Sequence, residues 1–168
     1  MRNRLAWLTL AISVRALAAD DQGPVLTDIA QSRNLALGGA YESLGYGAES
    51  VSGNPAALSL YKRYQMEASG SWDIPNGYGM ATVALADSTN ALAAGVAYQY
   101  VTYGAHNRRW AHLTTGALAL SLADWLHVGA AVRHQVILGA TNTNSVTMNA
   151  GLVVRPAQFL SLGFSGHN

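Results

Sequence analysis

The sequence predicts an all-β fold: an antiparallel, up-and-down transmembrane β-barrel that is incomplete, with seven or so strands present, preceded by a glycine-rich segment. Three observations predict it. Apolar and polar residues alternate with a period of two, the segments between these stretches differ systematically in length, and aromatic residues stand at their ends. Of 168 residues, 50% are apolar and only 11% charged. This composition excludes a disordered chain, because disorder requires few apolar residues and many charges.

The first 18 residues predict a secretory signal peptide. Arg2 and Arg4 precede an apolar run from Leu5 to Val14, which is too short for a membrane-spanning helix of roughly 20 residues. Cleavage after Ala18 removes three of the ten basic residues and leaves seven against nine acidic ones, a net charge of −2. We expect export to the outer membrane of a Gram-negative bacterium, and a buried N-terminal helix is the alternative.

Four stretches show the alternation expected of a strand with one apolar face. They are residues 64–73, 126–138, 146–155 and 160–165. Three further stretches have small or apolar residues on both faces, namely 78–86, 91–102 and 110–122. For residues 110–122 a helix is the rival, because Ala and Leu favour helices, but Thr114, Thr115 and Gly116 favour a strand.

The connections between these stretches are of two kinds. Those after the first, third and fifth strands are residues 74–77, 103–109 and 139–145, and those after the second, fourth and sixth are 87–90, 123–125 and 156–159. The first kind is longer in two cases out of three. Short periplasmic turns and longer external loops are typical of outer-membrane barrels, and strands of about ten residues suit a tilted membrane crossing.

The apolar face is expected to point outward, so that Val128, Val132 and Leu152 meet acyl chains. The opposite face carries small residues with scattered Gln, Asn, Arg and Glu, whereas a solvent-facing sheet would carry more Lys and Glu. Aromatic residues at both water boundaries form the girdles of such barrels. Those at or near predicted strand ends are Tyr61, Tyr64, Trp72, Tyr78, Tyr100, Tyr103, Trp110, Trp125 and Phe159. A soluble, secreted β-sandwich that acts as a binding module is the alternative.

The N-terminal region resembles a known family. Residues 34–59 contain Gly38-Gly39-Ala40 followed by Asn54-Pro55-Ala56-Ala57-Leu58, a pattern similar to the start of the FadL-like and PorV/PorQ-like outer-membrane proteins. Residues 149–168 resemble the same family's strand, Arg-Pro turn and strand. The resemblance implies that residues 35–59 partly plug the barrel, with Gly38, Gly39, Asn54, Pro55 and Ala56 in plug or gating positions. From the residues alone, Asn54-Pro55 predicts an extended residue and then a helical turn that starts at Pro55.

The predicted domains are a signal peptide over residues 1–18, the plug-like segment over 19–59 and barrel strands over 60–168. Seven strands are an odd number, whereas bacterial single-chain barrels have even numbers and the FadL family about twice as many. We therefore expect the chain to be the N-terminal part of a longer barrel. The alternative makes residues 34–44 an eighth strand of a small complete barrel.

Five polar residues are predicted to line the lumen, because charges facing lipid cost several kcal/mol. They are Glu67, Arg133, Gln135, Asn149 and Arg155. Arg133 and Arg155 either belong to a hydrogen-bond network that keeps the lumen rigid, or line a permeation path that favours anionic head groups.

The sequence contains no convincing catalytic or metal motif, so we expect a protein that is not an enzyme and has no cofactor. Ser59-Leu60-Tyr61-Lys62 matches Ser-x-x-Lys, but no Ser-Asp-Asn or Lys-Thr-Gly follows. Gly45-Tyr46-Gly47 lacks the strand, helix and third glycine of a dinucleotide loop. The five histidines show no metal-ligand spacing and are interpreted as loop or lumen residues. The longest run of basic residues is Arg108-Arg109, which excludes a nucleic-acid-binding protein.

The resemblance implies two functions. Family members transport hydrophobic small molecules across the outer membrane, or anchor and shuttle secreted proteins without transporting anything, as the PorV-like proteins do. The expected partners are outer-membrane lipid, the barrel-assembly machinery and a hydrophobic ligand. A continuous lumenal path or lateral opening would distinguish the first function from a plugged barrel with a large loop surface.

Overall fold

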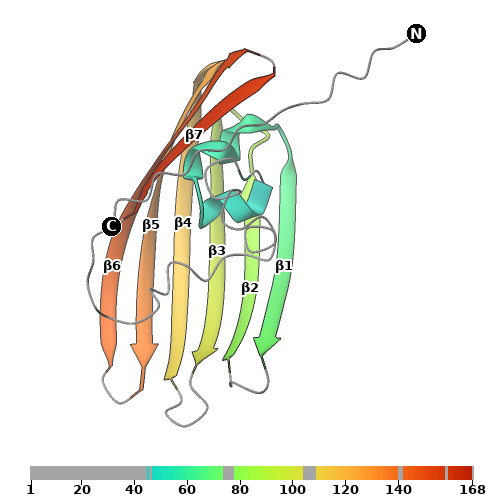
Figure 1. Ribbon diagram of the computed structural model, residues 1–168. Coiled ribbons are helices and arrows are strands. Elements are labelled where there is room, and N and C mark those ends of the chain that lie inside the picture. The colour runs from blue at the N-terminus through green and yellow to red at the C-terminus, as the bar shows by residue number, and fades with distance from the viewer. Residues whose placement is uncertain are drawn as a thin grey trace.

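A computed structural model describes residues 45, 47–73, 78–103, 109–139, 142–157 and 159–167. Seven strands form one antiparallel sheet in chain order, each hydrogen-bonded to the next (Figure 1). They are β1 (Tyr64–Asp73), β2 (Tyr78–Asp87), β3 (Leu92–Tyr103), β4 (Arg109–Ala123), β5 (Leu126–Leu138), β6 (Thr143–Ala157) and β7 (Leu160–His167). The all-β prediction and the order of the seven strands are confirmed, including the strand at residues 110–122, for which a helix was the rival.

The boundaries of β6 differ from the prediction at both ends. The strand begins at Thr143, inside the predicted connection 139–145, and continues through Pro156 to Ala157. Pro156 fits because the register to β7 shifts between Val154 and Ala157, and a bulge is one of the few places where a strand tolerates a residue without a backbone N–H.

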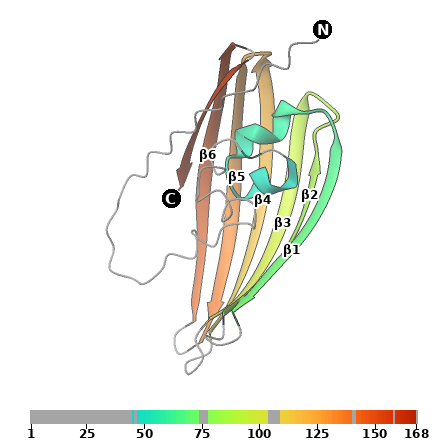
Figure 2. The same ribbon diagram turned by 45° about the vertical axis from the view of Figure 1, so that its right-hand side comes forward.

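The sheet is curled into a half-barrel, as the view in Figure 2 shows. Most side chains of its concave face are small or polar, apart from Met80, Val101, Leu113, Ile137 and Val153, whereas its convex face carries many large apolar side chains that are exposed. On the convex face Met66, Val146 and Met148 are 72%, 64% and 66% exposed. Val132 is 45% exposed, and Val128 and Leu152 are partly exposed on the same side.

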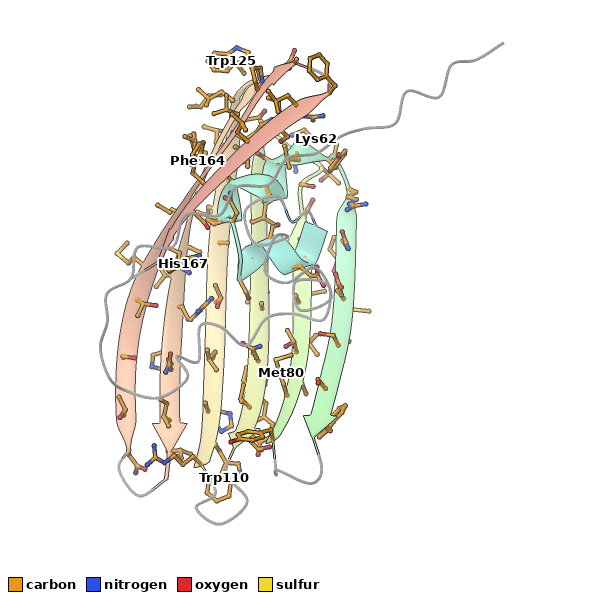
Figure 3. All side chains as sticks on the ribbon, viewed as in Figure 1. Lys62, Met80, Trp110, Trp125, Phe164 and His167 are labelled. Atoms are coloured by element: carbon orange, nitrogen blue, oxygen red, sulfur yellow. The ribbon has the colours of Figure 1, made fainter. Side chains whose placement is uncertain are left out.

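No strand or helix of the described residues covers the convex face (Figures 1 and 2). Val128, Val132 and Leu152 point away from the enclosed side of the sheet, as predicted, and their contact with acyl chains stays a prediction. Trp110 and Trp125 lie at opposite ends of the sheet (Figure 3), and both are exposed, as expected for aromatic residues near strand ends.

Two short 3-10 helices precede the sheet and lie against its concave face (Figures 1 and 2). They are η2 (Gly47–Val51) and η3 (Pro55–Leu60). Gly47 has φ +83°, a left-handed conformation that glycine adopts readily. We call residues 47–60 the docked segment. It lies nearer to the end of the sheet that carries Trp125 than to the end that carries Trp110 (Figure 3).

Within the described ranges, the chain has no helix of the length and hydropathy that a membrane crossing demands.

Candidate functional site

The candidate site is the concave face together with the docked segment. The helix η2 contacts β1 to β4, and η3 contacts β3 to β6, so the segment reaches across most of the sheet. Its side chains are almost all buried, from Ala48 to Val51 and from Asn54 to Ser59. A segment with this much buried surface is held by specific contacts with the strands.

A pair of glycines on β5 and β6 makes room for the segment. Gly129 and Gly151 are direct partners in the ladder between the two strands. A Cβ atom at Gly129 would lie 2.5 Å from the backbone nitrogen of Ala56, and one at Gly151 would lie 2.9 Å from the same atom. Only side-chain-free positions allow the backbone to approach this closely. The pair therefore forms the seat for residues 54–56.

Asn54 attaches the docked segment to β6 and β7, the last two strands of the sheet. Its Oδ1 accepts a hydrogen bond from the Ala56 N–H at 3.1 Å, and its Nδ2 donates to the carbonyls of Leu152 at 3.3 Å and Phe164 at 3.2 Å. The backbone of Asn54 is extended, with φ −90° and ψ 104°, and Pro55 opens η3. The predicted extended residue followed by a helical turn is thus confirmed, and the same side chain also binds the paired strands β6 and β7.

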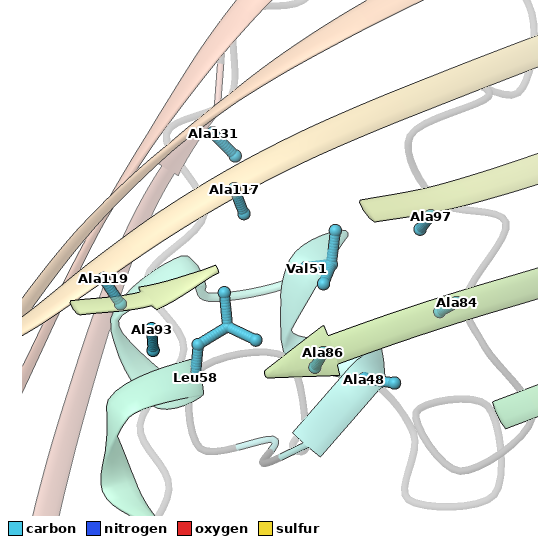
Figure 4. Packing of buried hydrophobic residues seen from close by; sticks show 10 residues of the cluster. All are labelled: Ala48, Val51, Leu58, Ala84, Ala86, Ala93, Ala97, Ala117, Ala119 and Ala131. Carbon is cyan, nitrogen blue, oxygen red and sulfur yellow. The ribbon is translucent and has the colours of Figure 1, made fainter. Parts of the chain in front are cut away.

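The other half of the segment packs on alanines. Val51 and Leu58 lie within a buried cluster whose remaining members are all alanine (Figure 4). These are Ala48, Ala84, Ala86, Ala93, Ala97, Ala117, Ala119 and Ala131. Small side chains on the strands leave space for two larger ones from the segment, so the concave face is shaped to receive it.

Replacing Asn54 by alanine is expected to loosen the segment. The loss of the cap and of two buried hydrogen bonds should lower the free energy of opening by about 2 kcal/mol. The reporter is the single-cysteine variant Ala57→Cys, whose thiol would be buried in a chain with no other cysteine. Reaction with a maleimide should then accelerate roughly 30-fold, because each 1.4 kcal/mol is a factor of ten.

Asn54→Asp is the matched comparison for this experiment. Aspartate keeps the acceptor for the Ala56 N–H but turns a carboxylate towards the two carbonyl oxygens. It should therefore protect the thiol no better than alanine does. Protection by aspartate equal to that by asparagine would contradict the role given to the Leu152 and Phe164 contacts.

Arg133 is one of the predicted lumen-lining residues, and the structure places it beneath the docked segment. It is only 6% exposed. Its Nη2 donates to the Ser52 carbonyl at 2.9 Å, and its Nε donates to Thr115 Oγ1 at 3.4 Å. A buried guanidinium bonded in this way joins the segment to β4 and β5. This geometry supports the interpretation of Arg133 as part of a rigid hydrogen-bond network.

The other predicted lumen residues are spread over the same face. Register places Glu67 opposite Ala84, Gln135 opposite Ser145 and Asn149 opposite Ala131. Asn149 is buried, and Arg155 follows at the irregular end of β6, where its backbone N–H donates to the Trp125 carbonyl at 2.7 Å. The structure therefore brings Arg133 to the docked segment but does not gather the five residues into one cluster. Gly38 and Gly39 lie outside the described residues, as do residues 34–44 and the signal peptide.

A serine–histidine contact sits where the segment leaves the concave face. His127 Nδ1 lies 2.9 Å from Ser59 Oγ and 3.2 Å from Ser121 Oγ. Both hydroxyls donate to backbone carbonyls, Ser59 to Ala56 and Ser121 to Ala123, so Nδ1 is best assigned as the donor. A serine nucleophile needs a neighbouring base that accepts its proton. Here the imidazole of His127 donates its proton to the serine hydroxyl instead. The contact thus ties Ser59 to β5 and β4.

Lys62, the last residue of the Ser-x-x-Lys match, donates to the Asn90 carbonyl at the turn between β2 and β3. Its ammonium group is engaged at this turn, whereas Ser59 is engaged with His127. Among the described residues, no group of three His, Asp or Glu side chains could hold a metal ion.

An apolar cluster at the other end of the concave face was not predicted. Met80, Val101, Ala111 and Leu113 are buried there, and Ile137 packs against them. Alternation on β2, β3 and β4 could have indicated it, but these strands were interpreted as having small or apolar residues on both faces. The glycine pair was missed for a different reason, since its meaning depends on a register that one sequence does not provide.

None of the family models, curated proteins or solved structures compared with the chain matches it.

Proposed function

We propose that this chain forms part of the wall of an outer-membrane β-barrel, with its convex face against lipid and the docked segment in the lumen. One observation carries the proposal, namely that the large apolar side chains stand on the exposed side of the sheet. Leu118 and Phe164 are 53% and 55% exposed, like the methionines of the same face. In water such a continuous apolar surface would be costly, whereas acyl chains solvate it without loss.

A soluble sandwich fits the side-chain distribution less well. A sandwich buries its large apolar residues between two sheets and turns polar residues to water. Here the covered face carries mainly Ala, Gly, Thr and Asn beside one cluster of larger apolar residues, and the covering element is the docked segment of 14 residues, 47 to 60, rather than a second sheet. The inverted arrangement is what a membrane barrel requires.

The docked segment also bears on the number of strands in the proposed barrel, because it needs room inside the lumen. An eight-stranded barrel has an interior just wide enough for its own side chains, and here two short helices lie on the inner face. In addition, β1 and β7 run in the same direction, because each of the six connections in the meander reverses the strand. Antiparallel closure therefore requires an odd number of further strands. The first point favours a barrel with more than eight strands, and the second requires an even total.

Passage or storage of hydrophobic small molecules is the function we propose for this barrel. The cluster formed by Met80, Val101, Ala111, Leu113 and Ile137 provides an apolar wall on the inner face, separate from the alanine cluster that receives the docked segment. Apolar walls with a few polar groups are typical of sites for hydrophobic ligands. Since these side chains are buried, a solute would reach them only after a local opening.

A non-transporting barrel that anchors or escorts a secreted protein is the second candidate. The observation that favours it is the firm attachment of the docked segment by Asn54, Arg133 and the alanine cluster. A permanently filled lumen would serve an anchor and would block a channel.

Two measurements test the proposal. Cell fractionation should place the protein in the outer membrane, released only by detergent, and recovery from the periplasm without detergent would rule out the barrel. Vesicles that contain the purified protein should then take up a fluorescent long-chain fatty acid faster than protein-free vesicles. Insertion without any uptake would favour the anchor.

A further inference from the structure

A group of hydrogen-bonding side chains interrupts the apolar convex face near the end that carries Trp110. We call it the polar band, and its members are Tyr98, Tyr100, His112, Thr114, His134 and Asn144. The Tyr98 hydroxyl lies 2.7 Å from His112 Nδ1, and His134 Nε2 lies 2.8 Å from Asn144 Oδ1. The Tyr100 ring contacts the His112 ring at a tilt of 50°, with centroids 5.2 Å apart.

The ladder register shows that these residues form a continuous band across four strands. Tyr98 on β3 pairs with Thr114 on β4, which pairs with His134 on β5. One step nearer the strand tips, Tyr100 pairs with His112, and Val136 pairs with Asn144 on β6. All of them alternate onto the convex face together with Val96, Val132 and Met148, so the band follows directly on the apolar surface.

The length of the apolar surface matches a membrane whose boundary is the polar band. On β4, Leu122 and Thr114 are eight residues apart, which corresponds to about 27 Å along the strand at roughly 3.4 Å per residue. A tilt of about 40° reduces this to about 21 Å along the membrane normal, close to the roughly 25 Å apolar height of outer-membrane barrels. Trp110 and Leu138 would then project beyond the lipid.

The charges near the band suit an anionic partner. In the described strands, Asp87 is the one acidic residue that alternates onto the convex face, and it lies at the opposite end of β2. The part of the convex face around the band therefore carries no negative charge among the described residues, and Arg109 at the tip of β4, which alternates onto the other face, is the nearest cation along that strand. Each imidazole of the band uses one ring nitrogen for its neighbour, which leaves the other for a bond outside the protein, and exposed hydroxyl and imidazole groups are suitable donors to phosphate.

We propose that the polar band binds the phosphate-bearing head groups of membrane lipids and so fixes the depth of the barrel. The proposal rests on the proposed function, because it requires the convex face to meet lipid. It places the membrane boundary at Thr114 and His134 and not at the tips of the strands. The segments of β3 to β6 beyond the band then form a rim that stands in water.

Depth-dependent quenching tests the boundary, since a chain without cysteine accepts single labels cleanly. Thr114→Cys, Met148→Cys and Leu138→Cys, each carrying an environment-sensitive fluorophore, are reconstituted with lipids that bear a nitroxide on the head group or deep in the chain. The label at 114 should be quenched best from the head group, the label at 148 best from the chain, and the label at 138 weakly by both. Strongest head-group quenching at 138 would overturn the proposal. Failure of every nitroxide to quench 148 would overturn the proposed function itself.

Lipid selectivity tests the phosphate contact. The wild-type protein in phosphatidylcholine vesicles should retain spin-labelled phosphatidylcholine over a spin-labelled galactosyl diacylglycerol, which has no phosphate, by at least about two-fold, the ratio that corresponds to one modest hydrogen bond. The double variant His112→Phe, His134→Leu should lose this preference, whereas Val132→Leu, Met148→Leu should keep it. A preference that survives the first pair of changes, in a protein that still inserts, would overturn the assignment of the band to lipid phosphate.

Discussion

Replacing Gly129 and Gly151 together by alanine is expected to release the docked segment from the concave face. The two new methyl groups would occupy the space of the Ala56 backbone, and backbone atoms cannot turn aside as a flexible side chain can. Overpacking of this kind at two paired positions should lower the free energy of docking by about 3 kcal/mol or more. The Ala57→Cys reporter should then react with a maleimide at least about 100-fold faster.

Gly116→Ala is the matched control for that change. Nothing lies within 4 Å of a Cβ atom built at Gly116, although this glycine also stands in the middle of a strand. It should leave the reaction rate of the reporter unchanged. Equal rates in the control and in the glycine-pair variant would mean that the pair does not seat the segment.

Met148→Arg is expected to have the second large effect, on insertion into the membrane. This side chain is 66% exposed on the convex face and lies one convex position inside the polar band. An arginine facing lipid costs about 2–4 kcal/mol at mid-depth and about 1 kcal/mol or less near the interface, so we expect a cost of about 1–2 kcal/mol here. The measurement is the urea concentration at which half of the protein folds into lipid vesicles. The folded fraction is read from a gel, on which folded and heat-unfolded barrels migrate differently.

Two comparisons separate charge from other effects of the Met148 change. Met148→Leu keeps an apolar side chain of similar size and should fold like the wild type. Ser145→Arg places the same charge on the concave side of the same strand, opposite Gln135, where it should cost little. If arginine were tolerated equally at both positions, the convex face would not be in contact with lipid.

The strands could be predicted because their information is local. The alternation in β1 and β5 gave Tyr64–Asp73 and Leu126–Leu138 with the bounds found in the structure. The weaker alternation of β4 arises because its concave positions are alanine, leucine and threonine beneath the apolar cluster and the docked segment. The end of β6 was misjudged because proline normally ends a strand, and a bulge between Val154 and Ala157 cannot be seen in one sequence.

The candidate site was only partly predictable. The Asn54-Pro55 pair allowed the local conformation of residues 54–56 to be predicted. The prediction rested on the restrictions that proline places on its own backbone and on the residue before it. Their partners did not stand out, because Gly129, Gly151, Leu152 and Phe164 become neighbours only through strand pairing. His112 and His134 were interpreted as loop or lumen residues, although His134 shares a face with Val132 and Val136. The structure places both histidines on the convex face, where they form the polar band.

The hydrogen bonds of Asn54 also constrain the order in which the molecule can assemble. Its two carbonyl partners lie 98 and 110 positions further along the chain, so the amide has nothing to bind until the last hairpin exists. Contacts that close such long loops form slowly, because chain entropy opposes them until much of the structure is in place. Residues 54–56, which precede all seven strands in the chain, consequently reach their final position only after β6 and β7 have paired.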